Sequence, residues 1–189
     1  ETSIVLAATD GFRLTVESLS LSKKPLEEAM SYVIPSRSLL EVSKAISETA
    51  VISFGVEFDS KNHQVIFTLG SMEISTRLLD GDFPPYQQII PNTYNTKISV
   101  DKELLLSAVK RASLFARDNA NVVKVLIEGQ IVKVMAENNQ VGSNVTEIES
   151  SVEGNDLSMA FNARYLLDYL SILDTDIVEW ETEGELKPS

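Results

Sequence analysis

The sequence predicts an α+β protein made of repeated units, each with one helix and several antiparallel strands, and with the helices on one face of the sheets. Two observations lead to this prediction. Three segments with the same apolar register recur along the 189 residues, and runs of alternating apolar and polar residues lie between them. The hydrophobic fraction of 43% is sufficient for one large domain or two small ones, each with its own core.

The three repeated segments are predicted helices. Each has two adjacent leucines five and six residues after an apolar residue that ends a strand-like stretch. Apolar side chains recur at helical spacing within them, as at Leu39, Val42 and Ile46. The segments are IPSRSLLEVSKAI from Ile34, VDKELLLSAVKRA from Val100 and FNARYLLDYLSIL from Phe161.

Polar residues near the start of each segment support the same assignment. Ser36, Asp101 and Asn162 are residue types whose side chains accept hydrogen bonds from the free N–H groups of a first helical turn. We therefore expect helices over residues 34–47, 100–117 and 161–173.

Strands are predicted wherever apolar and polar residues alternate between turn residues. The stretch VLAATDGFRLTVESLSL, which precedes the first helix, predicts two strands around a turn. Two units of one helix and its strands make a small α+β domain. The other predicted strands are VISFGVEF, QVIFTLG and MEISTRLL after the first helix, and VVKVLIE, IVKVMAEN and NVTEIESS after the second.

The chain holds nearly three such units, which implies a domain boundary within it. The segment DGDFPPYQQIIPNT is rich in Pro, Asp and Asn, residues that favour loops. We expect one domain over residues 1–92 and a second over residues 93–189. The chain begins inside a hairpin and ends at GELKPS, where a further strand is expected. Both ends are therefore predicted to be cut within a unit.

Charge is distributed unevenly along this acidic chain. The formal net charge is −12, yet the three predicted helices contain seven basic and four acidic residues, against nine basic and 24 acidic residues elsewhere. Lysine and arginine favour helices and solvate exposed helix surfaces, which explains the pattern without any ligand. A helical surface that faces a phosphate backbone without reading bases explains it as well. Both explanations stay open on the residues alone.

No motif in the sequence favours an enzyme or a cofactor. The chain has no cysteine, and its single histidine, His63, lies in a predicted surface turn. In ATDGFRL, the position that a phosphatase nucleophile would occupy is Ala8. We therefore expect no catalytic residue, no metal and no cofactor. Since long apolar runs and a basic leader are absent from the sequence, we expect a cytoplasmic location.

Four segments, in matching order and spacing, resemble the bacterial beta sliding clamp family, the DNA polymerase III beta subunits. They are ATDGFRL, IPSRSLLEVSKAI, RLLDGDFPPYQQIIP and FNARYLLDYLSIL. The resemblance implies a DNA clamp fold, with this chain covering the later part of the middle domain and most of the third domain, without its last strand. In that family, two protomers form a ring whose helices surround duplex DNA. The resemblance therefore implies a non-catalytic processivity factor for DNA replication.

The resemblance also implies a pocket for a short peptide between the middle and third domains. Such peptides carry a glutamine and bulky apolar residues, and an apolar groove with a few polar anchors suits them. Implied partners are the catalytic subunit of the replicative polymerase, the clamp loader and repair polymerases. Phe12 and Ala120 differ from residues that are common in the family. The matching positions are Thr9, Gly11, Phe12, Arg13, Leu14, Pro84 and Ile89.

Two further surfaces follow from the resemblance. Leu114 and Phe115 match an apolar pair that meets the first domain of the other protomer, so a homodimer is expected for the full-length protein and no closed ring for this chain. Two alternatives remain: an α+β scaffold that binds proteins and never meets DNA, and an enzyme with an unfamiliar site. Cations that match the DNA-facing surface, where contacts are independent of sequence, are Arg37, Lys44, Lys102, Lys110, Arg111 and Arg164.

Overall fold

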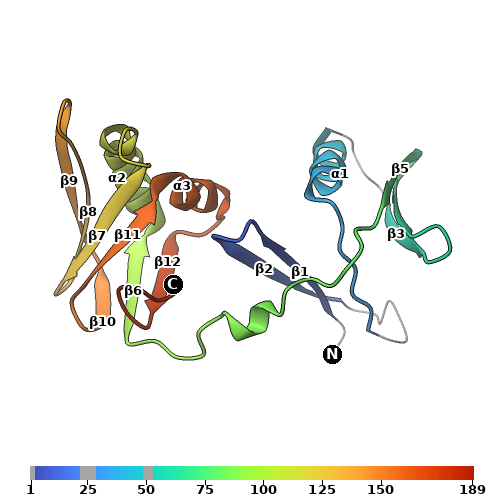
Figure 1. Cartoon of the computed structure of the whole chain (residues 1–189), viewed down its shortest axis with the longest axis horizontal. Helices are drawn as coiled ribbons and strands as arrows, with labels where there is room; N and C mark the ends of the chain where they lie inside the picture. The colour runs from blue at the N-terminus through green and yellow to red at the C-terminus, as the bar shows by residue number, and fades with distance from the viewer. Residues whose placement is uncertain (1–2, 22–28, 49–52) are drawn as a thin grey trace. The chain divides into compact units, whose positions relative to one another are not determined.

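The chain divides into two compact units, Glu1–Tyr86 and Gln87–Ser189 (Figure 1). A short 3₁₀ turn, η1 (Tyr86–Gln88), spans the division. The sequence predicts the boundary after residue 92. The loop around that position is hydrogen-bonded to the second unit, since the Asn95 N–H donates to the Thr182 carbonyl at 2.9 Å. The computed structural model describes residues 3–21, 29–48 and 53–189.

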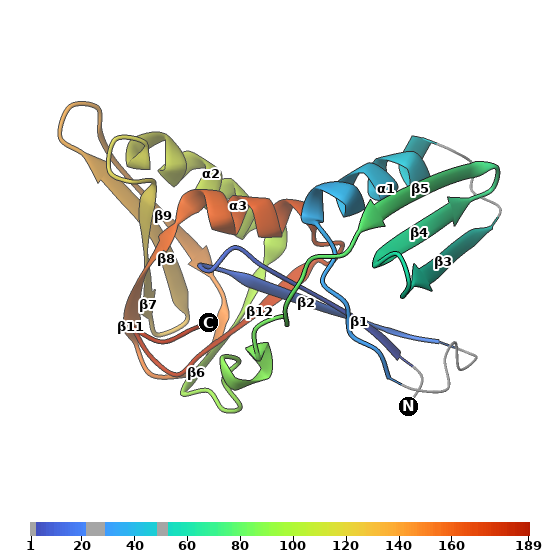
Figure 2. The ribbon, with the colours of Figure 1, turned by 45° about the vertical axis from the view of Figure 1, so that its right-hand side comes forward.

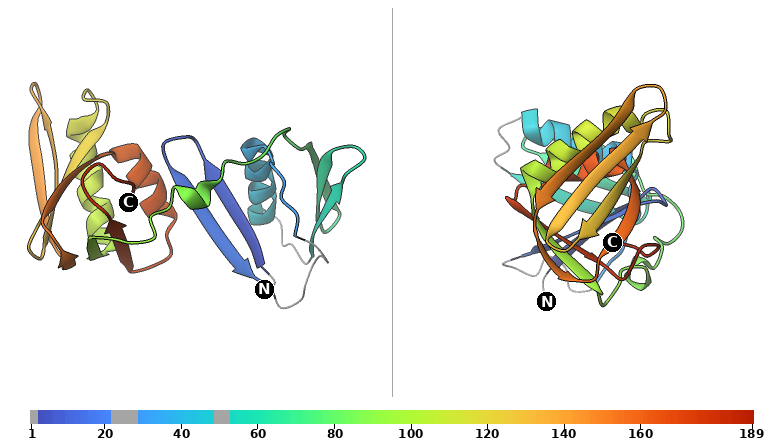
Figure 3. Two further views of the ribbon diagram at one scale, coloured as in Figure 1. Left: turned by 60° about the horizontal axis from the view of Figure 1, so that its bottom comes forward. Right: turned by 90° about the vertical axis from the view of Figure 1, so that its left-hand side faces the viewer.

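The first unit opens with a hairpin of β1 (Ser3–Thr9) and β2 (Leu14–Ser20), seen in Figure 3. The two strands pair antiparallel, from Ser3 opposite Ser20 to Thr9 opposite Leu14. The stretch VLAATDGFRLTVESLSL predicts this hairpin correctly, because alternating residues flank a turn that contains glycine.

The remainder of the first unit is one helix against one sheet (Figure 2). Helix α1 (Ser36–Glu48) packs on a sheet of order β3-β4-β5, formed by β3 (Phe54–Asp59), β4 (Gln64–Leu69) and β5 (Met72–Arg77). The central strand β4 contributes most of the core, since it is covered on both edges. The buried apolar residues of this part are Val42, Val65, Phe67, Leu69 and Leu78.

The second unit contains two helices and two antiparallel sheets. One sheet has the order β10-β6-β12, and the other has the order β11-β7-β8-β9. The helices are α2 (Lys102–Ala116) and α3 (Ala163–Ile172). The strands are β6 (Thr96–Asp101), β7 (Val122–Glu128), β8 (Ile131–Asn138), β9 (Gly142–Glu149), β10 (Ser151–Gly154), β11 (Leu157–Asn162) and β12 (Ile177–Thr182).

A single apolar core joins the helices and sheets of the second unit. Helices α2 and α3 lie side by side, and α2 also lies against β7, β8 and β9 (Figure 2). Every second residue of β7 is buried, as expected for a strand with one face on a core. Trp180 of β12 joins this core and meets the ring of Phe161 edge to face, with ring centroids 5.0 Å apart. The predicted α+β architecture is confirmed.

The repeat predicted from the sequence is visible at the helix starts. Strands β6 and β11 run directly into α2 and α3, where Asp101 and Asn162 are the N-caps and accept the N–H groups of Leu104 and Arg164. Helix α1 differs, because Ser36 is its first residue and the Pro35 carbonyl accepts the N–H of Ser38 at 3.0 Å. No strand precedes α1 within the described residues 29–35.

Four strands of the second unit, β6, β10, β11 and β12, are absent from the list of predicted strands, and only β6 and β11 are anticipated, as the strand-like stretches before the second and third helices. β10 has four residues, which is too short for a periodicity to emerge. β12 has the sequence IVEWET, in which apolar and polar residues partly alternate. Half of its residues are charged or polar, so the segment is also compatible with a loop when the neighbouring strands are unknown. Both strands pair with β6, so β6 becomes the centre of its sheet.

His63 lies in the turn between β3 and β4 with a φ of +52°, in agreement with its prediction as a turn residue. Its Nε2 lies 3.2 Å from Oδ1 of Asp80, a partner remote in sequence. The described part of the chain contains no group of three or more His, Cys, Asp or Glu side chains placed to hold a metal ion. Within the same residues, no helix combines the length and the apolar character needed to cross a membrane.

Candidate nucleic-acid and peptide-binding sites

The turn between β1 and β2 is held by the side chains of its own first residues. The Asp10 carboxylate accepts the N–H groups of Phe12 and Arg13 at 3.0 and 3.1 Å, and the Thr9 hydroxyl donates to the Arg13 carbonyl at 2.7 Å. The hydrogen bond from the Phe12 N–H is the main reason that the pKa of Asp10 lies below its usual value of 3.8. Gly11 has a φ of +89°, which favours glycine.

The turn presents predicted peptide-binding residues in one ordered segment. The side chain of Phe12 is 82% exposed, whereas Leu14 is half-buried at the start of β2. The Arg13 guanidinium donates to the second Asp10 oxygen at 3.0 Å, which limits its rotation. The structure therefore brings five of the predicted residues, Thr9 and Gly11–Leu14, together in one turn.

The other two predicted peptide-binding residues lie on either side of the division between the units. Pro84 belongs to the first unit, and its carbonyl accepts the Tyr86 N–H at 2.7 Å. Ile89 belongs to the second unit, and its side chain is 58% exposed. Both are therefore near the surface-exposed segment around η1.

Cations on the helices differ in whether they already have a partner. Lys44 pairs with Glu41 at 3.1 Å, and the Arg111 guanidinium donates to the Ser107 hydroxyl at 2.6 Å. Within the described residues, the exposed side chains of Arg37, Lys110 and Arg164 form no ion pair or side-chain hydrogen bond. These three cations are the most available to an anionic ligand.

Lys102 is the least available of the predicted DNA-facing cations. Its side chain is 17% exposed, its ammonium pairs with Glu103 at 2.8 Å, and it donates to the Leu173 carbonyl at 3.3 Å. The hydrogen bond to Glu103 raises the pKa of Lys102 above its usual value. Its position suits a link between α2 and the end of α3 better than a mobile contact with a ligand.

Two of the three lysines in the sheets of the second unit, Lys97 and Lys133, are paired with carboxylates of neighbouring strands, whereas Lys124 of β7 is exposed. Lys97 pairs with Glu179 and Glu181 at 3.1 and 3.2 Å, and hydrogen bonding to Glu179 raises the pKa of Lys97 above its usual value. Lys133 pairs with Glu128 and Glu147 in the same way, at 2.8 and 3.1 Å. The Lys97 and Lys133 side chains are therefore less available to an anionic ligand than the unpaired helix cations.

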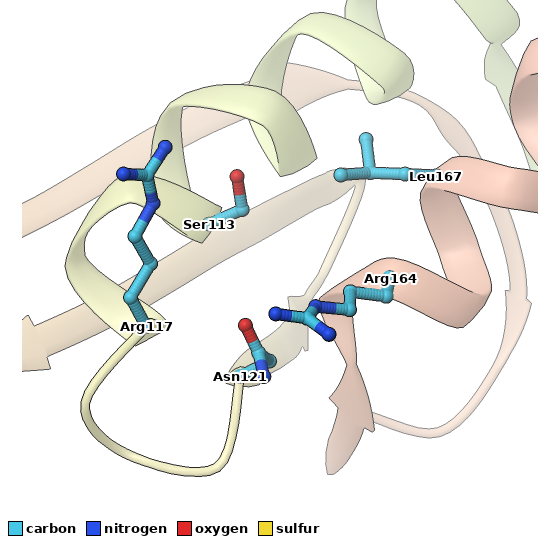
Figure 4. Close-up of a pocket in the computed structure, with 5 residues that line it drawn as sticks. All are labelled: Ser113, Arg117, Asn121, Arg164 and Leu167. Atoms are coloured by element: carbon cyan, nitrogen blue, oxygen red, sulfur yellow. The ribbon is translucent and has the colours of Figure 1, made fainter.

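A pocket of about 440 Å³ lies where α2 ends and α3 begins (Figure 4). Of its lining residues, only Arg164 is among the predicted site residues. Arg117 follows the last turn of α2, and Asn121 is at the end of the next loop. Arg117 is one of the basic residues of the predicted helix 100–117 but is not among the predicted DNA contacts, because no motif marks Arg117 or Asn121. The lining residues are Ser113, Arg117, Asn121, Arg164 and Leu167.

The apolar pair at the end of α2 is split between surface and core. The Leu114 side chain is 55% exposed, while Phe115 is partly buried and packs against the core of the second unit. Adjacent positions on a helix point about 100° apart, so one residue can face solvent while the next faces the sheet. Leu114 is thus the member of the pair that is free to contact another protein.

Two family profiles match consecutive parts of the chain. The central domain of the DNA polymerase III beta subunit matches residues 1–85, and its C-terminal domain matches residues 87–189. The chain belongs to the DNA polymerase III beta subunit family. The profiles meet within one residue of the division between the two compact units of the structure.

Curated and solved relatives agree with membership of the DNA polymerase III beta subunit family. The chain is 32% identical to the beta sliding clamp of Staphylococcus aureus in an alignment of 190 positions that covers 100% of this chain and 49% of that protein. It therefore spans about half the length of the curated relatives it matches. The beta chain from Streptococcus pneumoniae is 31% identical, with a TM-score of 0.90 over 99% of this chain and 49% of that one. The sliding clamp of Bartonella birtlesii, solved with griselimycin, is 29% identical, with a TM-score of 0.89 over 98% of this chain and 50% of that one.

Proposed function

We propose that the chain is part of a sliding clamp, a non-catalytic ring that encircles duplex DNA and tethers the replicative polymerase to it. The observation that carries the proposal is the match of both family domains, in order, over nearly the entire chain. The beta sliding clamp name of the staphylococcal relatives supports it, as does the fold shared with solved clamps at identities near 30%. The proposed location is the cytoplasm, where the replicating DNA of a bacterium lies.

The proposed DNA contacts are the helix cations, which would meet phosphates without reading bases. The excess of basic over acidic residues in the helices of an otherwise acidic chain supports this assignment, and Lys97 and Lys133 of the sheets are already paired with carboxylates. Arg37, Lys110 and Arg164 are exposed and lack such partners among the described residues, so they would contribute most. Lys44, Arg111 and Lys102 would contribute less, since each would first have to leave a neighbouring group. Exposed phosphate contacts are weak and salt-sensitive, which suits a ring that slides.

The proposed partner site is the segment Thr9–Leu14 together with Pro84 and Ile89. The hydrogen bonds of Asp10 and Thr9 support it, because a preorganised turn loses little conformational entropy when a peptide binds. Exposed apolar side chains, Phe12 and Ile89, supply surface for bulky residues of a short motif. The proposed partners are the polymerase catalytic subunit, the clamp loader and repair polymerases.

The proposed assembly is a homodimeric ring in the full-length protein, with Leu114 at the contact between protomers. An apolar side chain that is 55% exposed at a helix end is a suitable contact for another subunit. The isolated chain spans about half the length of its relatives, and we expect it not to close a ring. Its binding to linear DNA should therefore be weak and should fade as salt rises.

A peptide titration tests the partner site. A fluorescent peptide with a glutamine followed by leucine residues would be titrated into the chain and into an Arg13→Ala, Leu14→Ala variant, with anisotropy as the measurement. We expect the variant to bind about tenfold more weakly, because it lacks an apolar contact and an anchored cation. Leu19→Ala, at the far end of the same hairpin, is the matched control and should bind like the parent chain. Equal peptide binding by the parent chain and the double variant would exclude the partner site.

A titration with linear duplex DNA tests the other half of the proposal, the DNA contacts. Tight binding of linear duplex DNA by this chain at physiological salt would contradict retention by ring closure. No DNA binding at any salt would instead favour a scaffold that binds only proteins, which the net charge of −12 would explain.

A further inference from the structure

The pocket between the end of α2 and the start of α3 is a built feature of the second unit. Two backbone hydrogen bonds connect its walls: the Asn121 N–H donates to the Ala116 carbonyl at 2.9 Å, and the Ala163 N–H donates to the Asn121 carbonyl at 2.8 Å. Asn121 is therefore attached to both helices at once. The pocket has a volume of about 440 Å³ and is partly open to solvent, so a group on a larger ligand could enter it.

The loop that forms this pocket holds an unfavourable backbone conformation. Ala120 and Asn121 have φ values of +50° and +58°, a region that non-glycine residues seldom adopt. Asparagine tolerates it, but alanine does so at a cost of about 1 kcal/mol. Such local strain is concentrated at binding sites, where it fixes the direction of a side chain. Here it directs the Asn121 side chain toward the pocket (Figure 4).

Two arginines line the pocket without a carboxylate to neutralise them. Arg117 and Arg164 are exposed and form no ion pair within the described residues. Asp118, next to Arg117 in sequence, instead accepts a hydrogen bond from the Asn138 amide at 3.0 Å. In Figure 4 the Arg164 guanidinium points toward Asn121, while Arg117 extends along another side of the pocket. Both guanidinium groups carry a positive charge beside the pocket, and this favours an anionic ligand there.

We propose that this pocket binds one phosphate group, held by Arg117, Arg164 and the Asn121 amide. The inference rests on the proposed function, under which the phosphate belongs to the backbone of duplex DNA. Guanidinium groups donate paired hydrogen bonds that match phosphate oxygens. A tetrahedral phosphate presents oxygens in several directions and can accept hydrogen bonds from three donors on separate walls. A planar carboxylate matches the paired N–H groups of only one guanidinium. The Ser113 hydroxyl donates to the Lys110 carbonyl at 2.7 Å, so it shapes the wall and is not a fourth donor.

The salt dependence of DNA binding tests the pocket. A short labelled duplex of mixed sequence would be titrated at several salt concentrations into the chain, into Arg117→Gln and Arg164→Gln, and into the double variant. If both arginines grip one phosphate, the double variant should lower the slope of log K against log salt by about 0.9, and each single variant by no more than that. Affinity at low salt should fall about fivefold in the double variant.

Lys124→Gln is the matched control, because it removes the same charge from an exposed position of the same unit. Lys124 lies on β7 between the buried residues Val123 and Val125, so it is on the opposite face of the strand from the core and α2. We expect this variant to bind DNA like the parent chain. Fluorescence of the single tryptophan, Trp180, and circular dichroism would verify that every variant is folded.

Each outcome decides between the pocket and the proposed function. DNA binding by the parent chain that changes no more in the arginine variants than in Lys124→Gln would overturn the pocket and leave the clamp function intact. A loss of slope near 1.8 in the double variant would mean two separate phosphate contacts, and would also overturn the single-phosphate proposal.

Titrations with free anions test whether the pocket recognises a phosphate group that is not part of duplex DNA. Inorganic pyrophosphate and a polyglutamate peptide would be titrated while the side-chain amide signal of Asn121 is followed by NMR. A shift with pyrophosphate that Arg117→Gln and Arg164→Gln abolish supports the phosphate pocket, even if the chain does not bind duplex DNA and the proposed function fails. A larger shift with polyglutamate than with pyrophosphate would show that the pocket prefers carboxylates, contrary to the proposal.

Discussion

Gly154, at the end of β10, occupies a position that no other residue fits. Its φ is +120°, and a Cβ atom there would overlap the Asn95 carbonyl oxygen and lie 2.7 Å from the Thr96 Cα. The obstacle is backbone, which cannot move aside as a flexible side chain would. This glycine therefore permits the close approach of β10 to β6.

Replacement of Gly154 by alanine should destabilise the second unit by about 2–4 kcal/mol, because backbone strain and overlap add together. Gly142→Ala is the matched control, since Gly142 also has a positive φ, +111°, but a Cβ there would meet nothing within 4 Å. The control should lose about 1 kcal/mol from strain alone. Urea unfolding followed by Trp180 fluorescence measures both, and equal losses would contradict the overlap.

Asp59 is a residue whose charge stabilises one turn of the first unit. Its carboxylate accepts the N–H groups of Lys61 and Asn62 and the Asn62 side-chain amide, the last at 2.7 Å. The hydrogen bond from the Asn62 side chain is the largest cause of the lowered pKa of Asp59. Stabilisation by a carboxyl group with a lowered pKa is complete above its usual value of 3.8 and is lost as the pH falls through the folded pKa.

We therefore predict that Asp59→Asn makes the stability of the first unit less dependent on pH below about pH 4. The variant should be less stable than the parent at neutral pH, and the difference should shrink as the solution becomes acidic. NMR intensities of β3 and β4 amides in urea, at several pH values, measure this. Asp82→Asn is the control, because Asp82 forms no hydrogen bond with the described residues. A constant difference at all pH values would refute the prediction.

At the scale of the element, the N-caps explain where α2 and α3 begin. The Asp101 carboxylate accepts the Leu104 N–H at 2.8 Å, and Asp101 is also the last residue of β6. A strand can therefore turn into a helix without an intervening loop, because one side chain replaces the missing backbone partner. The same arrangement recurs at Asn162, between β11 and α3.

Asp101→Ala should lower the free energy of unfolding of the second unit by about 1 kcal/mol, since the cap hydrogen bond and the favourable charge at the helix start are both lost. Asp101→Asn keeps the hydrogen bond and should recover most of the loss. Urea unfolding monitored at Trp180 provides the measurement. If alanine and asparagine were equally destabilising, the cap hydrogen bond would not be the cause.

At the scale of the whole molecule, the two units differ in the size of their cores. Among the described residues, the main cluster of the first unit has five buried apolar residues, whereas that of the second has twenty. Hydrophobic burial is the main favourable term in folding, so we expect the second unit to have the larger free energy of unfolding. Exposed apolar side chains on β1 and β2, such as Leu6 and Leu19, add to this difference.

We predict that the isolated chain unfolds in two steps, with the first unit unfolding at lower urea. The only tryptophan, Trp180, lies in the second unit and should report the later step alone. Far-UV circular dichroism sees both units and should change earlier than the fluorescence. Coincident transitions by the two probes would indicate one cooperative molecule and would contradict the prediction.

The local pattern of the sequence determined the helices, most strands, the hairpin turn and the family. Helical spacing, capping residues and alternation depend on residues that are close in sequence, so they can be recognised without knowledge of the tertiary structure. The four segments that resemble the clamp family were sufficient to predict a membership that the domain profiles confirm. The family resemblance also selected Arg164 as a candidate DNA contact.

Only the tertiary structure decided which cations have partners and which residues share a pocket. Lys102 and Arg164 both appear as exposed helix cations in the sequence, but folding brings the Leu173 carbonyl to Lys102 and brings Asn121 to the pocket that Arg164 lines. Arg117 and Arg164 are 47 positions apart in the chain. Their meeting at one pocket depends on the packing of α2 beside α3. Such contacts arise from the closure of long loops around a common core, and no short-range pattern of residues encodes them.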